Sequence, residues 1–264
     1  MRRGSRKTTP RVKDGRVQRK NYRDVQAPRG GPLAIEVEVP GPGYRHLVTA
    51  DDLRRFFALI PEWAEVSAGL HAVVLADGDA GADGYYEGGV IELNAWPDPP
   101  AETYGARYFT GHRAVFDRLG VRWRLAPAFV AAIPTTGDLN RDLERAVKRL
   151  RDHIEDDDVE IDGPADEAAS EWAIHDPRDE SIHADVTRIG DELHVYERCY
   201  ALAFDRRTAR AYQLLHVFLH ELGHHIDASL PPRRGLLIRG EDYAEGWALR
   251  CADRIWGAYT AAFR

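Results

Sequence analysis

The chain is poor in cysteine and methionine and has no long apolar run. Of its 264 residues two are cysteines, Cys199 and Cys251, and one is methionine, Met1. Two cysteines do not make a disulfide framework, although a disulfide between them stays open. No run of about 18 apolar residues occurs, which argues against a membrane-spanning helix. The basic N-terminal residues lack the apolar segment of a secretory signal. We therefore expect a cytoplasmic protein without membrane contact.

Charge is distributed unevenly along the chain. The formal net charge is −7, yet residues 1–30 contain 11 Lys and Arg against two Asp and Glu. This segment has few apolar residues, so we predict a disordered basic tail, followed by one domain over residues 31–264. Contact with nucleic acid is one interpretation of the tail. We favour a solvated tail, or one that rests on the acidic remainder of its own chain.

The remainder of the chain shows both strand and helix patterns and no internal repeat. The N-terminal strands predicted from alternation and apolar runs are Leu33–Val39, Leu70–Ala76 and Val90–Asn94, the last in a hairpin with a turn at Gly88-Gly89. A second hairpin is predicted from Ile182–Ile189 and Glu192–Cys199 around Gly190-Asp191. The helices predicted before residue 200 are a short one from Thr49 or Asp51 to Ile60, Tyr104–Leu119, and the amphipathic Asp138–Ile154. This mixture predicts an α+β fold.

The most informative segment is His220–His224, which reads His-Glu-Leu-Gly-His. On a helix, residues four apart lie one above the other on the same face, so the two imidazoles can bind one metal ion from the same side. Glu221 points about 100° around the helix from His220 and can reach a water on that metal without binding the metal itself. The spacing predicts a catalytic zinc site with His220 and His224 as ligands and Glu221 as general base.

The residues around this motif support a metal. Asp205 can cap a helix from about residue 206 to about residue 228. Its apolar residues cover nearly the whole circumference, which predicts a buried central helix. The positions are Leu214, Leu215, Val217, Phe218, Leu219, Leu222 and Ile226. Polar side chains in such a helix are costly unless they are paired or bound to metal, so burial favours the metal over an exposed helix that carries His and Glu by chance.

A catalytic zinc site usually takes three protein ligands. One known pattern places a histidine six residues after the second ligand, above a methionine turn. Here Leu230 stands at that position, and the chain has no internal methionine. A glutamate from a following helix remains.

That helix is predicted from Gly240 to about Ala262, after a turn signal at Pro231–Gly235. We predict Glu245 as the third ligand, with Glu241, one turn earlier on the same face, as the alternative. Small residues beside Glu245 would allow a close approach between the two helices.

This set of four residues, His220, Glu221, His224 and Glu245, resembles the gluzincin group of zincin metallopeptidases. Those proteins carry His-Glu-x-x-His on one helix and a glutamate ligand on the next. The resemblance covers about residues 205–262, and the second helix lacks the Asn-Glu start of thermolysin-like proteins. It implies a zincin-like fold: a small twisted mixed sheet packed on a buried active-site helix, and a helical C-terminal part.

In zincins an edge strand of the sheet pairs with the substrate backbone. Val90–Asn94 is one candidate for that strand, with a core strand as its alternative. We favour Glu192–Cys199, because Val90–Asn94 is separated from the motif helix by about 110 residues. The alternative is that about residues 100–180 form an inserted subdomain.

Several neighbours of the motif are candidates for supporting roles. Asp227, three residues after His224, can accept a hydrogen bond from that imidazole. His216, Glu241 and Tyr243 are further candidates for the surroundings of the metal. For the donor to the oxyanion, the sequence leaves Tyr243, Tyr259, Tyr200 and His194 open. We expect His225 to be a packed or surface histidine.

The function predicted from these residues is zinc-dependent hydrolysis of peptide bonds, by an endopeptidase rather than an exopeptidase, acting on a peptide or protein. A protease restricted to one protein is a narrower version. The alternative of a different class is an inactive zincin-like protein that binds zinc or a partner. The presence of Glu221 favours catalysis, because a binding site needs no general base. The sequence does not predict the oligomeric state.

Overall fold

The structure is a computed structural model of the chain. It describes residues 12–13, 16–17, 32–78, 82–154, 159–161, 170–176, 181–230 and 240–263. Within the predicted basic tail it describes only strands β1 (Val12–Lys13) and β2 (Arg16–Val17), which pair antiparallel. The rest of the tail and the predicted turn at Pro231–Gly235 lie outside the described residues, so the predictions for them stay predictions.

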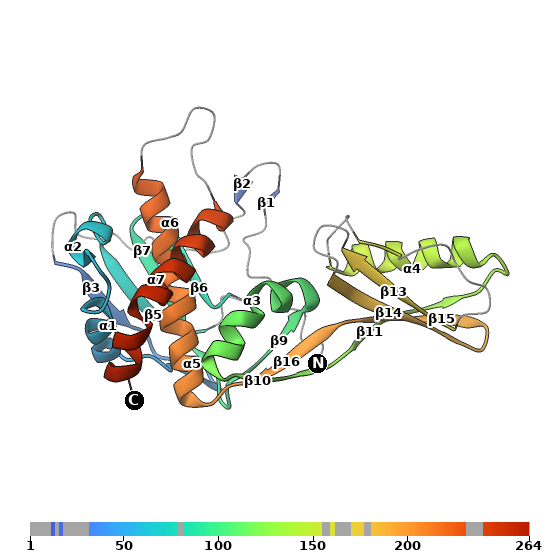
Figure 1. The fold of residues 1–264 in the computed structure, drawn as a ribbon, viewed down its shortest axis with the longest axis horizontal. Coiled ribbons are helices and arrows are strands. Elements are labelled where there is room, and N and C mark those ends of the chain that lie inside the picture. The colour runs from blue at the N-terminus through green and yellow to red at the C-terminus, as the bar shows by residue number, and fades with distance from the viewer. Residues whose placement is uncertain are drawn as a thin grey trace. The chain divides into compact units, whose positions relative to one another are not determined.

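Its contacts divide the chain into two compact units. One is formed by Ala101–Ala203, and the other by Arg6–Pro100 together with Phe204–Arg264. The segment between the first predicted hairpin and the motif helix therefore forms a unit of its own. Both units mix helices with small sheets, so the fold is α+β (Figure 1).

The unit that contains His220–His224 is built on a four-stranded mixed sheet. Its strands, in spatial order, are β3 (Ala34–Val37), β5 (Ala72–Ala76), β7 (Val90–Asn94) and β6 (Gly84–Glu87). The first three are parallel, and β6 runs antiparallel to β7. The predicted turn is confirmed: Gly88 and Gly89 join β6 to β7 with φ of 57° and 86°, a region that favours glycine. A short antiparallel pair, β4 (Tyr44–Arg45) and β8 (Trp96–Pro97), lies in the same unit.

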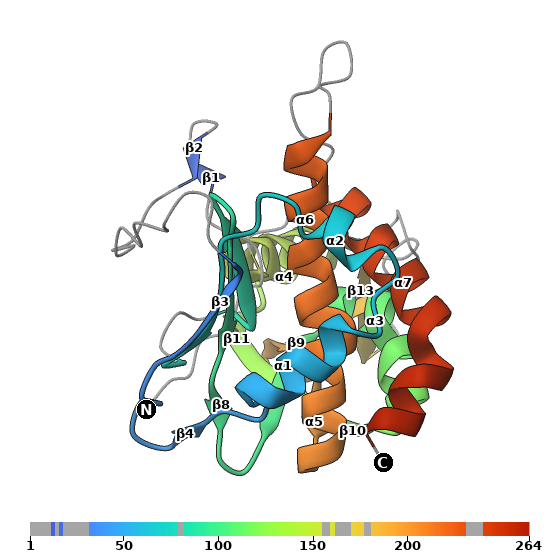
Figure 2. The same cartoon turned by 90° about the vertical axis from the view of Figure 1, so that its left-hand side faces the viewer.

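Helices pack against one face of this sheet (Figure 2). They are α1 (Ala50–Phe57), α2 (Trp63–Val66), α5 (Arg206–Tyr212), the π-helix η1 (Gln213–Phe218) and α6 (Leu219–Ser229). The last helix, α7 (Glu241–Ala262), packs against α6 and η1, on the side away from the sheet. Ile91 and Leu93 of β7 are buried, as are the aromatic rings of Phe56 and Phe218, which meet edge to face. Thr49 caps α1 through a hydrogen bond from the Asp52 amide, as one of the two predicted caps.

The predicted central helix is confirmed. Helices α5, η1 and α6 follow one another without a break from Arg206 to Ser229, and Asp205 caps their start. Every residue of η1 is buried. The π-helical turn was not predicted, because a stretch that is apolar on all sides has no periodicity to reveal an extra residue per turn.

The unit of Ala101–Ala203 contains two sheets. The three-stranded sheet has the order β10 (Arg122–Leu125), β16 (Cys199–Ala203), β9 (Ala101–Gly105), and α3 (Ala106–Leu119) packs on it. The five-stranded sheet has the order β11 (Ala128–Pro134), β15 (Glu192–Glu197), β14 (Ser181–Ile189), β13 (Glu171–Asp176), β12 (Glu160–Ile161).

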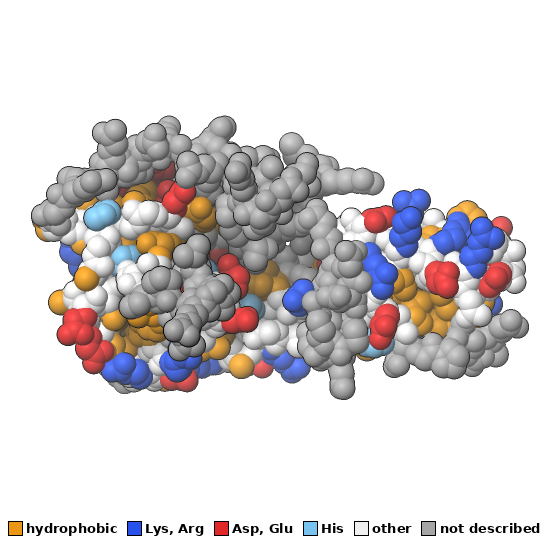
Figure 3. All heavy atoms as spheres, turned by 90° about the horizontal axis from the view of Figure 1, so that it is seen from above, with side chains coloured by type: hydrophobic (Ala, Val, Ile, Leu, Met, Phe, Trp, Pro, Cys, Tyr) orange, Lys and Arg blue, Asp and Glu red, His pale blue; other side chains and the backbone are white. Residues whose placement is uncertain are grey.

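The predicted amphipathic helix of this unit is confirmed as α4 (Leu139–Ile154), which covers one face of the five-stranded sheet. Lys and Arg side chains lie between acidic ones on the outer surface of α4 (Figure 3), as expected for a solvated face. The predicted hairpin of β14 and β15 is also confirmed.

Both candidates for an edge strand beside the motif helix are wrong. Val90–Asn94 is strand β7, which lies inside its sheet between β5 and β6, so the core strand that was its alternative is confirmed. Glu192–Cys199 contains β15, an inner strand of a sheet in the other unit. The strand that contacts α6 is β6, and it lies at the edge of the four-stranded sheet. Its four residues were too short a run to be separated from the turn that follows.

Among the described residues, no helix is long and apolar enough to cross a membrane.

Candidate metal centre

The two motif histidines lie together on α6. Their spacing of four residues places the rings on one face, where they meet edge to face with centroids 4.8 Å apart. The Nε2 atoms of His220 and His224 are 3.1 Å apart. Each side chain is about one-fifth exposed. The helix therefore presents two adjacent nitrogen donors at the surface of an otherwise buried element.

Helix α7 adds a carboxylate to this pair. The Oε2 atom of Glu241 lies 3.1 Å from Nε2 of His220 and 3.5 Å from Nε2 of His224. These three side chains form one of the groups whose donor atoms lie close enough to share a metal ion. Donors bound to one zinc ion at about 2.0–2.1 Å in a tetrahedron are roughly 3.3 Å apart. The observed separations of 3.1–3.5 Å match that spacing.

The close approach of α7 depends on a glycine. A Cβ atom on Gly223 would lie 2.7 Å from the Cα and 2.8 Å from the carbonyl oxygen of Ala244. The helices therefore cross where one has no side chain and the other has only a methyl group. This agrees with the expectation that small residues of the second helix allow the approach. It places the first turn of α7 beside His220.

Glu245 lies on the other side of the His220 ring. Its Oε2 atom is 3.1 Å from Nδ1 of His220, so that nitrogen donates to Glu245 while Nε2 faces Glu241 and His224. The geometry therefore favours Glu241 over Glu245, our first choice, as the third ligand: Glu241 lies beside both Nε2 atoms, whereas Glu245 contacts Nδ1 of His220. Both face His220 because residues one turn apart share a helix face. The sequence could not tell which of them points to Nε2.

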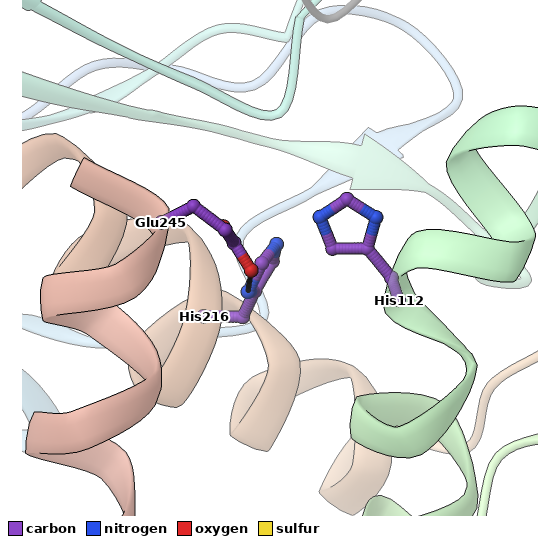
Figure 4. Close-up of side chains that lie close together, drawn as sticks. All are labelled: His112, His216 and Glu245. Atoms are coloured by element: carbon purple, nitrogen blue, oxygen red, sulfur yellow. Dashed lines mark ion pairs between the residues drawn. The ribbon is translucent and has the colours of Figure 1, made fainter. Parts of the chain in front are cut away.

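His216 lies one turn before His220 in the chain, and Figure 4 shows its ring beside Glu245. Its Nδ1 atom is 3.9 Å from Oε1 of Glu245, and its side chain is 6% exposed. His216 is therefore near the carboxylate that contacts His220. Its predicted supporting role at the metal stays a prediction.

Ionisation of the cluster follows from these contacts. Burial lowers the pKa of His220, but its hydrogen bonds to Glu241 and Glu245 outweigh burial and raise the pKa to about 10. The hydrogen bonds to His220 and His224 lower the pKa of Glu241 to about 2. Glu241 is therefore an anion at neutral pH, as a metal ligand must be, whereas His220 without a metal is protonated and must lose its Nε2 proton to bind one.

Glu221 lies between α6 and the edge strand β6. A Cβ atom on Gly84 of β6 would lie 2.5 Å from Cγ1 of Val217 and 3.3 Å from Cγ of Glu221. Burial raises the pKa of Glu221 to about 7, although His220 and His224 lower it in part. A carboxyl group that titrates near neutrality is suited to both accept and release a proton.

The remaining candidates differ in where they lie. Asp227 is buried, and its Oδ2 atom accepts a hydrogen bond of 3.0 Å from the Gly240 amide, while its predicted bond to the imidazole of His224 stays a prediction. Tyr243 lies in the first turn of α7 and is half-buried. Tyr259 is buried among the rings of Phe56 and Phe263. The last two oxyanion candidates, Tyr200 and His194, belong to the unit of Ala101–Ala203.

His225 is the neighbour whose role the sequence did not reveal. It is buried, and its Nε2 atom lies 3.1 Å from the carbonyl oxygen of Ala68, which can only accept, so Nε2 donates. Burial lowers its pKa, which keeps the ring neutral, so Nδ1 accepts from the hydroxyl of Tyr86 at 3.2 Å. His225 therefore ties β6 to α6. The signal available in the sequence was its position one turn after Glu221, away from the face of the two ligand histidines.

Comparison of the chain with protein-family models, with curated proteins and with solved structures finds no match.

Proposed function

We propose that the protein is a zinc-dependent peptidase whose metal is held by His220, His224 and Glu241. The observation that carries the proposal is the convergence of two Nε2 atoms and one carboxylate oxygen at separations of 3.1–3.5 Å. Two imidazoles and one carboxylate are a ligand set of catalytic zinc, which keeps a fourth position for water or substrate. The half-exposed Glu241 leaves that side of the cluster open to solvent.

The arrangement also supplies the groups that surround such a metal. Glu245 accepts from Nδ1 of His220 and so fixes both the tautomer and the ring orientation, which metal-bound histidines commonly need. Zinc at this position would lower the pKa of a water and polarise a carbonyl group. Glu221 would take the proton of the attacking water and pass it to the leaving amine.

The edge strand β6 is the proposed binding strand for the substrate backbone. It lies beside Glu221, and no other described strand pairs with its outer edge. An extended peptide that adds to this edge would carry its carbonyl groups past Glu221. Strand β6 would thus have the role that the resemblance to zincins implies for an edge strand. Binding of a peptide along the length of this strand favours an endopeptidase over an exopeptidase.

The mechanism is tested with Glu221→Gln. Since the amide cannot accept the proton, we expect peptide hydrolysis to fall by about 10²–10⁴-fold. The zinc content should stay at one ion, because Glu221 is not a ligand. Hydrolysis of a casein or peptide-library substrate, with zinc measured on the same sample, gives both values. Turnover equal to that of the unsubstituted protein would refute the mechanism.

The ligand set is tested with His220→Ala, which should lose the metal. The matched control is His225→Phe on the same helix, which removes a neighbouring imidazole that does not face the cluster and should retain zinc. Full zinc occupancy in His220→Ala would refute the ligand set. Zinc bound without hydrolysis of any peptide by the unsubstituted protein would favour the inactive zinc-binding alternative or a single-protein substrate.

A further inference from the structure

The buried carboxylate of Asp227 joins the end of α6 to the beginning of α7. It is 1% exposed, and its Oδ2 atom accepts from the backbone amide of Gly240 at 3.0 Å. Gly240 is the N-cap of α7, and Glu241 is the first residue of that helix. The carboxylate is therefore bonded to the residue that immediately precedes the proposed third ligand.

The N-cap residue of α7 provides no side-chain hydrogen bond to its own helix. Gly240 offers no side chain, so α7 begins without a side-chain cap. Gly240 adopts φ 76° and ψ −153°, a conformation that other residues rarely adopt. An anion at a helix N-terminus is favoured by the unpaired amides and by the helix dipole. Asp227 supplies that anion from the neighbouring helix.

We propose that Asp227 is a positioning residue that acts on the metal through Glu241. Asp227 lies three residues after His224, so one short stretch of α6 provides a ligand and also holds the backbone next to the third ligand. The inference rests on the proposed function, because it assumes that Glu241 binds the metal. It differs from the role that the sequence suggested for Asp227, which was to orient the imidazole of His224.

If Asp227 has this positioning role, its effect on zinc binding requires the presence of Glu241, whereas a purely structural role would not. If Asp227 fixes the position of Glu241, then Asp227→Ala should weaken zinc binding by about 10- to 100-fold, the usual cost of losing a group that orients a ligand. In a protein that already carries Glu241→Ala, the same substitution should change zinc affinity by less than about twofold. Asp227→Asn keeps an acceptor oxygen and should stay within about threefold of the unsubstituted protein.

The experiment is a double-mutant cycle on the full chain, with zinc affinity measured by competition against a chromophoric chelator. Gly240→Ala is the second route to the same contact: a Cβ there meets no atom within 4 Å, so it strains only the backbone and leaves Asp227 intact. It should also weaken zinc binding, and only when Glu241 is present. It keeps the test decisive if Asp227→Ala does not fold.

The matched control is Asp205→Ala. Asp205 also accepts backbone hydrogen bonds at a helix start in the same unit, but at α5. Its removal should lower thermal stability and leave zinc affinity unchanged. Equal losses with and without Glu241, or no loss for Asp227→Ala and Gly240→Ala, would overturn the inference. If the unsubstituted protein binds no zinc, the proposed function fails instead, so the two failures are distinguishable.

Discussion

The candidate metal centre requires a glycine at position 223, because α7 packs against this residue too closely to leave room for a side chain. The Cβ of Gly223→Ala would lie 2.7 Å from backbone atoms of α7, which cannot move aside without moving the helix. We expect this variant to lose about 1–3 kcal/mol of stability. It should also bind zinc more weakly, because Glu241 moves away from the histidines. Thermal unfolding and chelator competition measure the two effects.

The control for this prediction is Gly257→Ala, in an exposed position of α7. A Cβ there meets no atom within 4 Å, and alanine is the better helix former. Stability should therefore rise by about 0.5–1 kcal/mol, with zinc affinity unchanged. If Gly223→Ala behaves like Gly257→Ala, the close helix crossing does not hold the site together.

Residues of the site were predictable only where their relation is local. The placement of His220 and His224 on one face follows from their spacing within one helix. The choice between Glu241 and Glu245 does not, because both lie on the same face of α7. It depends on the height at which α7 crosses α6, and contacts between elements, such as Gly223 with Ala244, set that height.

At the scale of elements, β6 is joined to α6 by the chain of contacts from Tyr86 through His225 to Ala68. His225→Phe leaves the Ala68 carbonyl and the Tyr86 hydroxyl without this partner. We expect a loss of about 1–3 kcal/mol at pH 7. Tyr86→Phe removes only one of the two contacts and should cost less. Equal stability of His225→Phe and the unsubstituted protein in urea unfolding would contradict this anchoring.

This contribution should depend on pH. Burial places the pKa of His225 below its ordinary value of 6.5. The unfolded chain therefore takes up more protons than the folded protein as the pH falls below 6.5. The stability that the neutral ring provides is complete above pH 6.5 and decreases below it. The difference between the unsubstituted protein and His225→Phe should shrink from pH 7 to pH 5.

Helices were predicted better than the arrangement of strands. The central helix, α4 and α7 have long patterns and clear caps, and they appear within a few residues of the predicted bounds. Strand order depends on which segments pair, and the sequence does not reveal the pairing. The apolar residues of β7 fit an inner strand as well as an edge strand that is buried on both faces. The position of β6 at the sheet edge beside α6 therefore could not be predicted from the sequence.

At the scale of the whole molecule, the chain leaves the larger unit after Pro100, forms the unit of Ala101–Ala203, and returns to the larger unit at Phe204. The amide of Phe204 donates to the carbonyl of Pro100 at 3.3 Å, so the ends of the larger unit are adjacent. Replacing residues 101–203 with a short Gly/Ser linker should therefore preserve the larger unit. We expect the shortened protein to bind one zinc ion with its helical content retained, as measured by metal analysis and circular dichroism.

The control for the shortened protein is the same deletion combined with His220→Ala, which should fold and bind no zinc. An unfolded deletion variant would mean that the larger unit requires residues 101–203 for its stability. The sequence predicted the possibility of an insertion near this segment. It did not predict the adjacency of residues 100 and 204, which depends on a contact across more than a hundred residues.

The order of these segments along the chain has a consequence for biosynthesis. Strands β3, β5, β6 and β7 leave the ribosome long before η1 and α6, which pack against β7 and β6. Contacts this distant in sequence form slowly, and the uncovered sheet is exposed to aggregation in the meantime. The nascent chain should therefore need protection by chaperones until α6 and α7 emerge, and the candidate metal centre cannot assemble before that moment, because Glu241 belongs to α7.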